Sequence, residues 1–240
     1  MKNHFPETQQ KRKVRLLISK VYPVQMEIAG NTAIWTRPDT GDSPCSYPAP
    51  TYSAVKALFE SVLWGPDVLV EPVKVEICSP IRYHSYATNY GGPLRKDKSV
   101  KDGNNYQLYA TVLTDVCYRL YARVRPNPRK EKMPQAALEW DRRTTSPGHA
   151  YQEIFNRRLT RGQSFASLSL GWREFTPSYF GPFREGTKVC SEIPDIAIPS
   201  MLREVFPAGY RSDWRAVYDT NLVIHQGVLI YPERGRRCDQ

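Results

Sequence analysis

His149 follows Ser146 and Pro147 at the start of a segment with helical apolar spacing. Ser-Pro is typical of a helix start, because proline at the first helical position gives up no hydrogen bond. A histidine in the first turn lies at the positive end of the helix dipole, which favours its neutral, proton-accepting form. Two interpretations of His149 therefore stand: a general base, or an ordinary surface histidine beside a helix cap.

The other histidines and the cysteines give weaker signals. His84 lies in a long polar segment, where stacking or plain solvation explains it as well as catalysis does. His225 alternates with apolar neighbours, which favours a structural position in a strand. The four histidines lack metal-ligand spacing and the five cysteines contain no Cys-x-x-Cys pair. We expect no metal, no cofactor, no disulfide framework and a reducing cytoplasmic location.

The chain carries a large excess of positive charge. Its 240 residues hold 34 lysines and arginines against 24 aspartates and glutamates, a net charge of +10. This excess predicts an anionic partner, nucleic acid before a membrane surface, although an inert basic surface has the same composition. No run of about eighteen apolar residues appears, so we expect no membrane span.

Cations and aromatic residues gather along the chain where nucleic acid would be bound. Residues 80–106 mix tyrosines with cations, which suits base stacking and phosphate pairing, although a surface hairpin looks the same. Arg119 and Arg123 lie on one face of a predicted strand, and the arginines of 157–161 form either a phosphate track or a solvated helix face. The candidate RNA-binding residues are Tyr47, Arg82, Tyr86, Arg95, Lys96, Lys98, Arg119, Arg123, Arg157, Arg158, Arg161 and Arg173.

The segment 46–66 predicts the helix around which the other elements are arranged. Pro48 and Pro50 keep its entry extended, and Thr51 is a good N-cap. An apolar stripe follows at helical spacing, and Gly65-Pro66 ends the helix.

The order of predicted elements is strand, helix, strand, hairpin or loop, strand, helix, strand, at 24–36, 51–64, 68–77, 80–106, 108–124, 146–162 and 163–175. This order predicts an α+β fold of the ferredoxin-like (RRM-like) βαββαβ type with a long β-hairpin thumb. Short strands near the C-terminus add a small antiparallel β subdomain. We expect a basic arm at 1–23 with a net charge of +5 (six cations against Glu7), an RNA-binding domain at 24–175 and the β subdomain at 176–240.

Several sequence blocks carry a resemblance to a known family. They are Ser46–Thr51 with Leu63–Pro66, Ser79–Arg82, the arginine-rich Phe155–Phe165, and Leu-Gly-Trp-Arg-Glu-Phe at 170–175. In this order they resemble the CRISPR-associated Cas-five family in its subtype I-C form, the d variant. The resemblance covers about 24–231 and leaves the basic arm outside.

The resemblance implies the ferredoxin-like fold with thumb and C-terminal sheet. It also implies binding to the repeat-derived 5′ handle of CRISPR RNA beside the backbone and large subunits of the Cascade complex, and possibly contact with target DNA. Subtype I-C members typically cut precursor CRISPR RNA without metal, using a tyrosine late in the first helix and a Lys-His pair that starts the second. These positions read Leu63 and Gly148-His149 here. Tyr52 and Lys56, one turn apart on one helix face, are candidate replacements.

Two functions from different classes remain open at this point. One is a metal-independent endoribonuclease that stays bound to its product, with His149, Tyr52 and Lys56 as its catalytic residues. The other is a binding and structural subunit that holds the RNA handle without cutting. A free-standing RNA-binding protein would require the family resemblance to be accidental.

Overall fold

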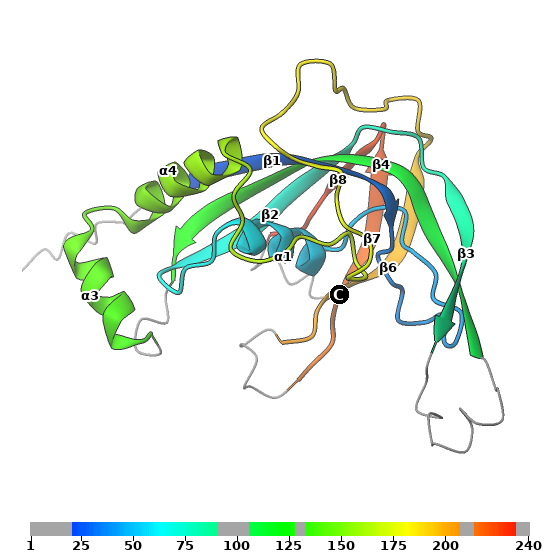
Figure 1. Cartoon of the computed structure of the whole chain (residues 1–240), viewed down its shortest axis with the longest axis horizontal. Helices are drawn as coiled ribbons and strands as arrows, with labels where there is room; N and C mark the ends of the chain where they lie inside the picture. The colour runs from blue at the N-terminus through cyan, green and yellow to red at the C-terminus, as the bar shows by residue number, and fades with distance from the viewer. Residues whose placement is uncertain (1–20, 91–105, 128–132, 207–213, 234–240) are drawn as a thin grey trace, which may run out of the picture.

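The computed structural model describes residues 21–90, 106–127, 133–206 and 214–233, which form a curled antiparallel sheet with few helices (Figure 1). The elements are β1 (Tyr22–Ala33), α1 (Tyr52–Val62), β2 (Val68–Ile77), β3 (Tyr83–Tyr90), β4 (Tyr106–Pro126), α3 (Gln135–Arg143), α4 (Pro147–Thr160), β5 (Tyr179–Gly181), β6 (Ile196–Glu204), β7 (Val217–His225) and β8 (Val228–Ile230). No helix in these ranges is both long and apolar enough to span a bilayer.

The sheet is arranged around the 21-residue strand β4. Its strands run in the order β5-β1-β4-β2-β8-β7-β6, and β3 pairs with β4 beside this path. The first part of β4 pairs with β3, and the remainder lies between β1 and β2. Figure 1 shows the β3–β4 hairpin projecting beyond one end of the sheet, with α3 at the opposite end.

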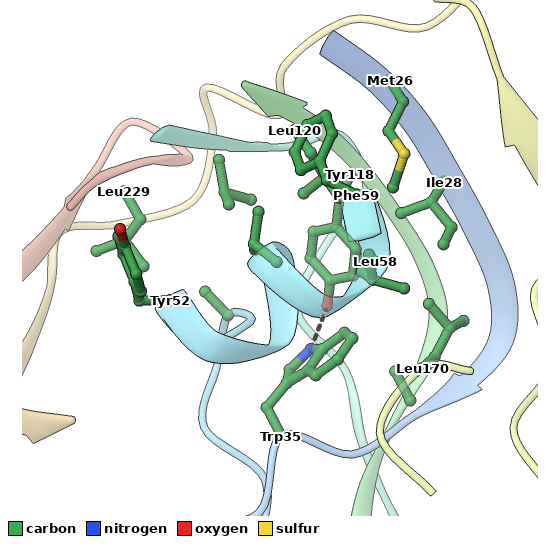
Figure 2. Packing of buried hydrophobic residues seen from close by; sticks show 14 of the residues in the cluster. Met26, Ile28, Trp35, Tyr52, Leu58, Phe59, Tyr118, Leu120, Leu170 and Leu229 are labelled. Carbon is green, nitrogen blue, oxygen red and sulfur yellow. Dashed lines mark hydrogen bonds between the residues drawn. The ribbon is translucent and has the colours of Figure 1, made fainter. Parts of the chain in front are cut away.

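Helix α1 packs its apolar stripe against the sheet, as its spacing predicts. The Thr51 side chain accepts a hydrogen bond from the Ala54 N–H at 3.2 Å, which confirms the predicted N-cap. Leu58 and Phe59 are buried, and Figure 2 shows them beside the strand residues of the core. There Trp35 donates its indole N–H to the Tyr118 hydroxyl at 3.2 Å, so a buried polar pair is satisfied.

The predicted strand at 163–175 is wrong. This segment is turn-rich, and the strand that pairs with β1 on that side is β5, between Tyr179 and Gly181. Leu168 and Leu170 are buried, so their alternation reflects side chains that enter the core from a loop. The Ile34 N–H donates to the Leu170 carbonyl at 2.9 Å, which fixes the loop on the end of β1.

Gly171 explains the tight geometry of that loop. Its φ is +103°, and a Cβ at this position would lie 1.8 Å from the Ile34 carbonyl oxygen. A side chain is excluded both by the positive φ of Gly171 and by the backbone of Ile34 just after β1. The Leu-Gly-Trp-Arg-Glu-Phe block therefore has a structural reason for its glycine.

Helix α3 and the C-terminal strands complete the comparison with the predicted elements. Helix α3 lies between the predicted elements at 108–124 and 146–162, where no element was predicted, and none of its residues is buried. In the C-terminal part, the predicted tight turn between strands is confirmed at Gln226-Gly227, where both residues have positive φ. Strand β8 also pairs with β2, which joins the C-terminal strands to the same sheet.

Candidate functional site

The start of α4 lies against the start of β1 (Figure 1). Pro147 takes the first helical position, and the Ser146 carbonyl accepts the Ala150 N–H at 3.0 Å. The Ser146 side chain makes no capping bond to the helix backbone. Its hydroxyl instead bonds the Tyr22 hydroxyl at 2.5 Å, and either oxygen can be the donor.

His149 is exposed in this first turn and lies beside Tyr22. The centroids of the two rings are 5.9 Å apart and their planes are tilted by 38°. The structure therefore places a phenol next to the histidine singled out from the sequence, and the phenol belongs to β1. Sequence patterns could not predict this pairing, because 127 positions separate the two residues in the chain.

The end of α1 contacts both an early and a late turn of α4. The Tyr151 hydroxyl donates to the Leu63 carbonyl at 2.5 Å, and the Arg158 guanidinium donates to the Val62 carbonyl at 3.0 Å. Burial raises the pKa of Tyr151 well above its ordinary value. These bonds satisfy carbonyls that an ending helix leaves without partners, so both side chains hold α1 and α4 together.

Tyr52 and Lys56 lie in the other half of α1 and are not brought to His149. Helix α1 has 11 residues and is therefore about 16 Å long, with Tyr52 at its first position and the contact with α4 at its last. Tyr52, a candidate catalytic residue, is only 5% exposed. Its ring packs edge-on against Tyr231, with the ring centroids 5.7 Å apart. The Arg203 guanidinium carbon lies over the same ring, 3.7 Å from its centroid. Lys56 pairs with Glu60 at 3.7 Å.

Two of the three arginines at the end of α4 are exposed. Arg157 and Arg161 make no side-chain hydrogen bond or ion pair within the described part of the chain, whereas Arg158 is committed to Val62. The sequence grouped the three together, because a run of arginines does not reveal which side chain turns toward a neighbouring helix.

We expect this difference to separate RNA binding from stability. Arg157→Ala with Arg161→Ala should lower the slope of log affinity for single-stranded RNA against log salt by about 1.4, because two phosphate contacts are lost. Arg158→Ala should keep that slope and lower the free energy of unfolding by about 1 to 2 kcal/mol, because a carbonyl loses its partner. Filter binding between 50 and 300 mM salt and urea unfolding measure the two effects. Equal slopes for the double variant and wild type would contradict the phosphate role.

The sheet face predicted to be cationic is largely neutralised by glutamates. Arg119 lies 3.6 Å from Glu27, and Arg123 lies 3.0 Å from Glu71 and 2.8 Å from Glu233. Their alternation on β4 was predicted correctly, since Tyr118, Leu120, Ala122 and Val124 are buried on the other face. Their partners come from β1, β2 and the segment after β8, which the alternation along β4 cannot show. An RNA phosphate would have to compete with these ion pairs.

Glu27 is the most buried member of this face, with no exposed surface. It accepts the Arg184 backbone N–H at 3.0 Å, the Arg184 guanidinium at 2.5 Å and the Thr187 hydroxyl at 2.8 Å. Burial raises the pKa of Glu27, but these hydrogen bonds outweigh burial and hold it below the ordinary value. The carboxylate therefore anchors the segment after β5 to β1.

The remaining predicted binding residues are scattered over the structure. Tyr47 is buried, and its hydroxyl accepts the Leu202 N–H at 3.3 Å. Tyr86 is partly buried and packs edge-on against Phe175, 5.3 Å between centroids. Arg82 is exposed 3.7 Å from Asp115, and Arg173 is exposed. Arg95, Lys96 and Lys98 lie outside the described residues.

Two exposed aromatic residues escaped the sequence analysis. Trp64 is 54% exposed just after α1, and Phe165 is 69% exposed in the loop after α4. The Phe165 N–H donates to the Ser61 carbonyl at 2.7 Å, so this loop also rests on the end of α1. Both aromatic residues were counted as parts of family blocks, and only their exposure shows that they can stack on unpaired bases. Among the described residues, no group of three or more His, Cys, Asp or Glu is placed to hold a metal ion.

Comparison with known proteins agrees with the resemblance found in the sequence. The family model Cas_Cas5d, described as CRISPR-associated protein (Cas_Cas5), matches residues 24–226. The chain is 30% identical over 161 residues to the CRISPR pre-crRNA endoribonuclease Cas5d of Thermus thermophilus, covering 66% of this chain but only 63% of that protein. It is 29% identical over 172 residues to the protein of the same description from Mannheimia succiniciproducens, covering 65% of this chain and 71% of that one.

A solved structure of a CRISPR-associated protein superimposes with a TM-score of 0.66 at 18% identity, over 92% of this chain and 97% of that one. This likeness concerns the fold alone, and it extends beyond the segment matched by sequence. The family model covers α1, α4 and β1 from Val24 onward, and Tyr22 lies just outside the matched residues. The chain therefore belongs to the CRISPR-associated Cas5 family, in its subtype I-C form.

Proposed function

We propose that this chain binds the repeat-derived 5′ handle of CRISPR RNA as a subunit of a cytoplasmic Cascade complex, and that it cuts precursor CRISPR RNA within the repeat. The observation that carries the cleavage proposal is the exposed imidazole of His149 at the junction of α1, α4 and β1. Support also comes from two relatives described as pre-crRNA endoribonucleases. Contact with the other Cascade subunits and with target DNA is part of the same proposal.

The proposed reaction uses the substrate's own 2′-hydroxyl as the nucleophile and needs no metal. His149 accepts the 2′-hydroxyl proton as the oxygen attacks the adjacent phosphorus. The bond from phosphorus to the 5′-oxygen breaks, which leaves a cyclic 2′,3′-phosphate and a 5′-hydroxyl. Arg157 and Arg161 follow along the exposed side of α4 and Trp64 lies at the end of α1, which supports an RNA path across this corner.

We also propose the ferredoxin-like assignment and the three-unit division at 1–23, 24–175 and 176–240. The strand order β5-β1-β4-β2, with each neighbouring pair antiparallel and with α1 and α4 as the connecting helices, supports the ferredoxin-like assignment. The antiparallel β3–β4 hairpin supports the proposal of a thumb. Strand β5 lies just past the boundary at 175 and pairs with β1, so the strand order places it with the second unit, and this boundary would then move past Gly181.

The decisive test uses repeat RNA from the chain's own CRISPR locus in EDTA. Wild-type protein should cut it at one position, and a single 2′-deoxy at that position should block the cut. His149→Ala should lower the single-turnover rate about 10²- to 10⁴-fold, because a general base is removed. His225→Ala is a matched control, an exposed histidine on β7 that pairs with Asp195, and should keep the wild-type rate.

The alternative function is a binding subunit that holds the RNA handle without cutting. The specific observation that favours it is Leu63 and Gly148 at the positions where the resemblance implies tyrosine and lysine. Tight binding of repeat RNA by wild-type protein with no cleavage would establish this alternative and reject the endoribonuclease proposal. Cleavage by His149→Ala at the wild-type rate would instead reject the assigned site.

A further inference from the structure

The ring of Tyr22 occupies space that only a glycine at position 148 leaves open. A Cβ on Gly148 would lie 2.5 and 2.7 Å from two carbon atoms of the Tyr22 ring, closer than real side chains approach. Gly148 is buried and its φ is not positive, so no backbone angle requires glycine there. Because Gly148 has no side chain, the phenol ring of Tyr22 can pack against it and lie next to His149.

We propose that Tyr22 is the general acid of the RNA cleavage, paired with His149 as the general base. This inference rests on the proposed function and adds a catalytic residue to it, from β1. Tyr22 is half-buried at the edge of the site, and the ring centroids of Tyr22 and His149 are 5.9 Å apart. Two groups at this separation can flank one phosphodiester, one on each side of the phosphorus.

Other tyrosines near the two helices are less suited to this role. The Tyr151 hydroxyl donates to the Leu63 carbonyl and the side chain is 4% exposed. Tyr52 is buried in the other half of α1. The Tyr22 hydroxyl bonds another hydroxyl, that of Ser146, which can act as donor or acceptor. A hydroxyl partner can donate or accept, so Ser146 can keep its hydrogen bond to Tyr22 before and after the phenol gives up its proton.

The proton balance of the step is complete with these two groups. The 2′-oxygen forms its bond to phosphorus and gives its proton to the His149 imidazole. The bond from phosphorus to the 5′-oxygen breaks, and the Tyr22 hydroxyl gives its proton to that oxygen. After release of the products, imidazolium loses its proton to water and the phenolate regains one from water.

The test compares two substrates in EDTA, one with the normal 5′-oxygen at the cut and one with a bridging 5′-sulfur. A thiolate leaves without protonation, so it needs no general acid. Tyr22→Phe keeps the ring beside Gly148 and removes the hydroxyl alone. It should slow single-turnover cleavage of the normal RNA about 100-fold and cleavage of the sulfur RNA less than about 3-fold. His149→Ala should slow both substrates.

The controls separate catalysis from structure. Tyr179 lies on β5, and its hydroxyl donates to the Pro182 carbonyl. Tyr179→Phe removes this hydroxyl and should leave both cleavage rates unchanged. RNA affinity and the thermal midpoint of Tyr22→Phe should match the wild-type values. Equal slowing of both substrates by Tyr22→Phe, or slowing of neither, would overturn the assignment while cleavage itself stands. Wild-type protein that binds both RNAs and cuts neither would overturn the assignment together with the proposed cleavage.

Discussion

Gly171→Ala is expected to lower the free energy of unfolding by more than about 4 kcal/mol, enough to leave a typical domain largely unfolded at 37 °C. A methyl group at this position would lie 1.8 Å from the Ile34 carbonyl oxygen, and the φ of +103° is also unfavourable for alanine. The neighbour is the backbone of the chain just after β1, which cannot rotate away as a flexible side chain can. The loop must therefore detach from β1 or the strand must shift.

Two glycine controls isolate the contact from the backbone angle. Gly41 has a φ of +57° with open space around its Cβ position, so Gly41→Ala should cost only about 1 to 2 kcal/mol of backbone strain. Gly186 has open space and no positive φ, so Gly186→Ala should change stability by less than about 0.5 kcal/mol. Urea unfolding of the three variants gives the comparison. A Gly171→Ala protein no less stable than Gly41→Ala would show that the loop does not approach Ile34 as described.

Glu27→Gln is expected to lower the free energy of unfolding by about 3 kcal/mol at pH 7, because the change removes the buried charge from Arg184 and Arg119. The amide keeps the size of the side chain, so the loss reports charge and hydrogen bonding and not a cavity. Asp39→Asn is the matched control. It breaks an exposed ion pair with Arg37 and should leave the unfolding midpoint unchanged.

The stability difference between wild type and Glu27→Gln should depend on pH. The pKa of Glu27 in the folded protein lies below its ordinary value of 4.5, so its stabilising contribution is complete above that value. The contribution is lost as the pH falls through the lower, folded pKa. The difference in stability between wild type and Glu27→Gln should therefore be constant from pH 6 to 8 and should shrink below about pH 4.5. A difference that grows toward low pH would contradict the ion-pair description.

The sequence predicted those helices and strands whose side-chain pattern can be recognised over a few neighbouring residues. The stripe of α1, the alternation along β4 and the Ser-Pro start of α4 are short-range patterns. Helices α1 and α4 begin within one residue of their predicted starts, and β4 begins two residues earlier than predicted. The strand at 163–175 failed because the buried leucines of a loop mimic an alternating strand. Burial alone does not distinguish the two, since only the hydrogen-bond partners of the backbone do.

The candidate site was predicted only in part, for a similar physical reason. His149 was found because a helix start has a sequence signature, whereas Tyr22 was missed because its role depends on packing between the first strand and the second half of the chain. The burial of Tyr52 could not be predicted, because Tyr231 and Arg203, which cover it, come from distant segments. Arg157 and Arg158 are adjacent in sequence, yet Arg158 donates a hydrogen bond to the Val62 carbonyl at the end of α1, whereas Arg157 is exposed.

The continuity of β4 limits how the hairpin can change in evolution. The same strand forms one side of the hairpin with β3 and then runs between β1 and β2 without interruption. An inserted or deleted residue within the shared part would turn Leu120 to the solvent-facing side and Arg119 into the core. Insertions and deletions are thus excluded from the shared part of β4. Family members should accordingly differ in how far the hairpin reaches while the spacing from Leu113 to Val124 stays fixed.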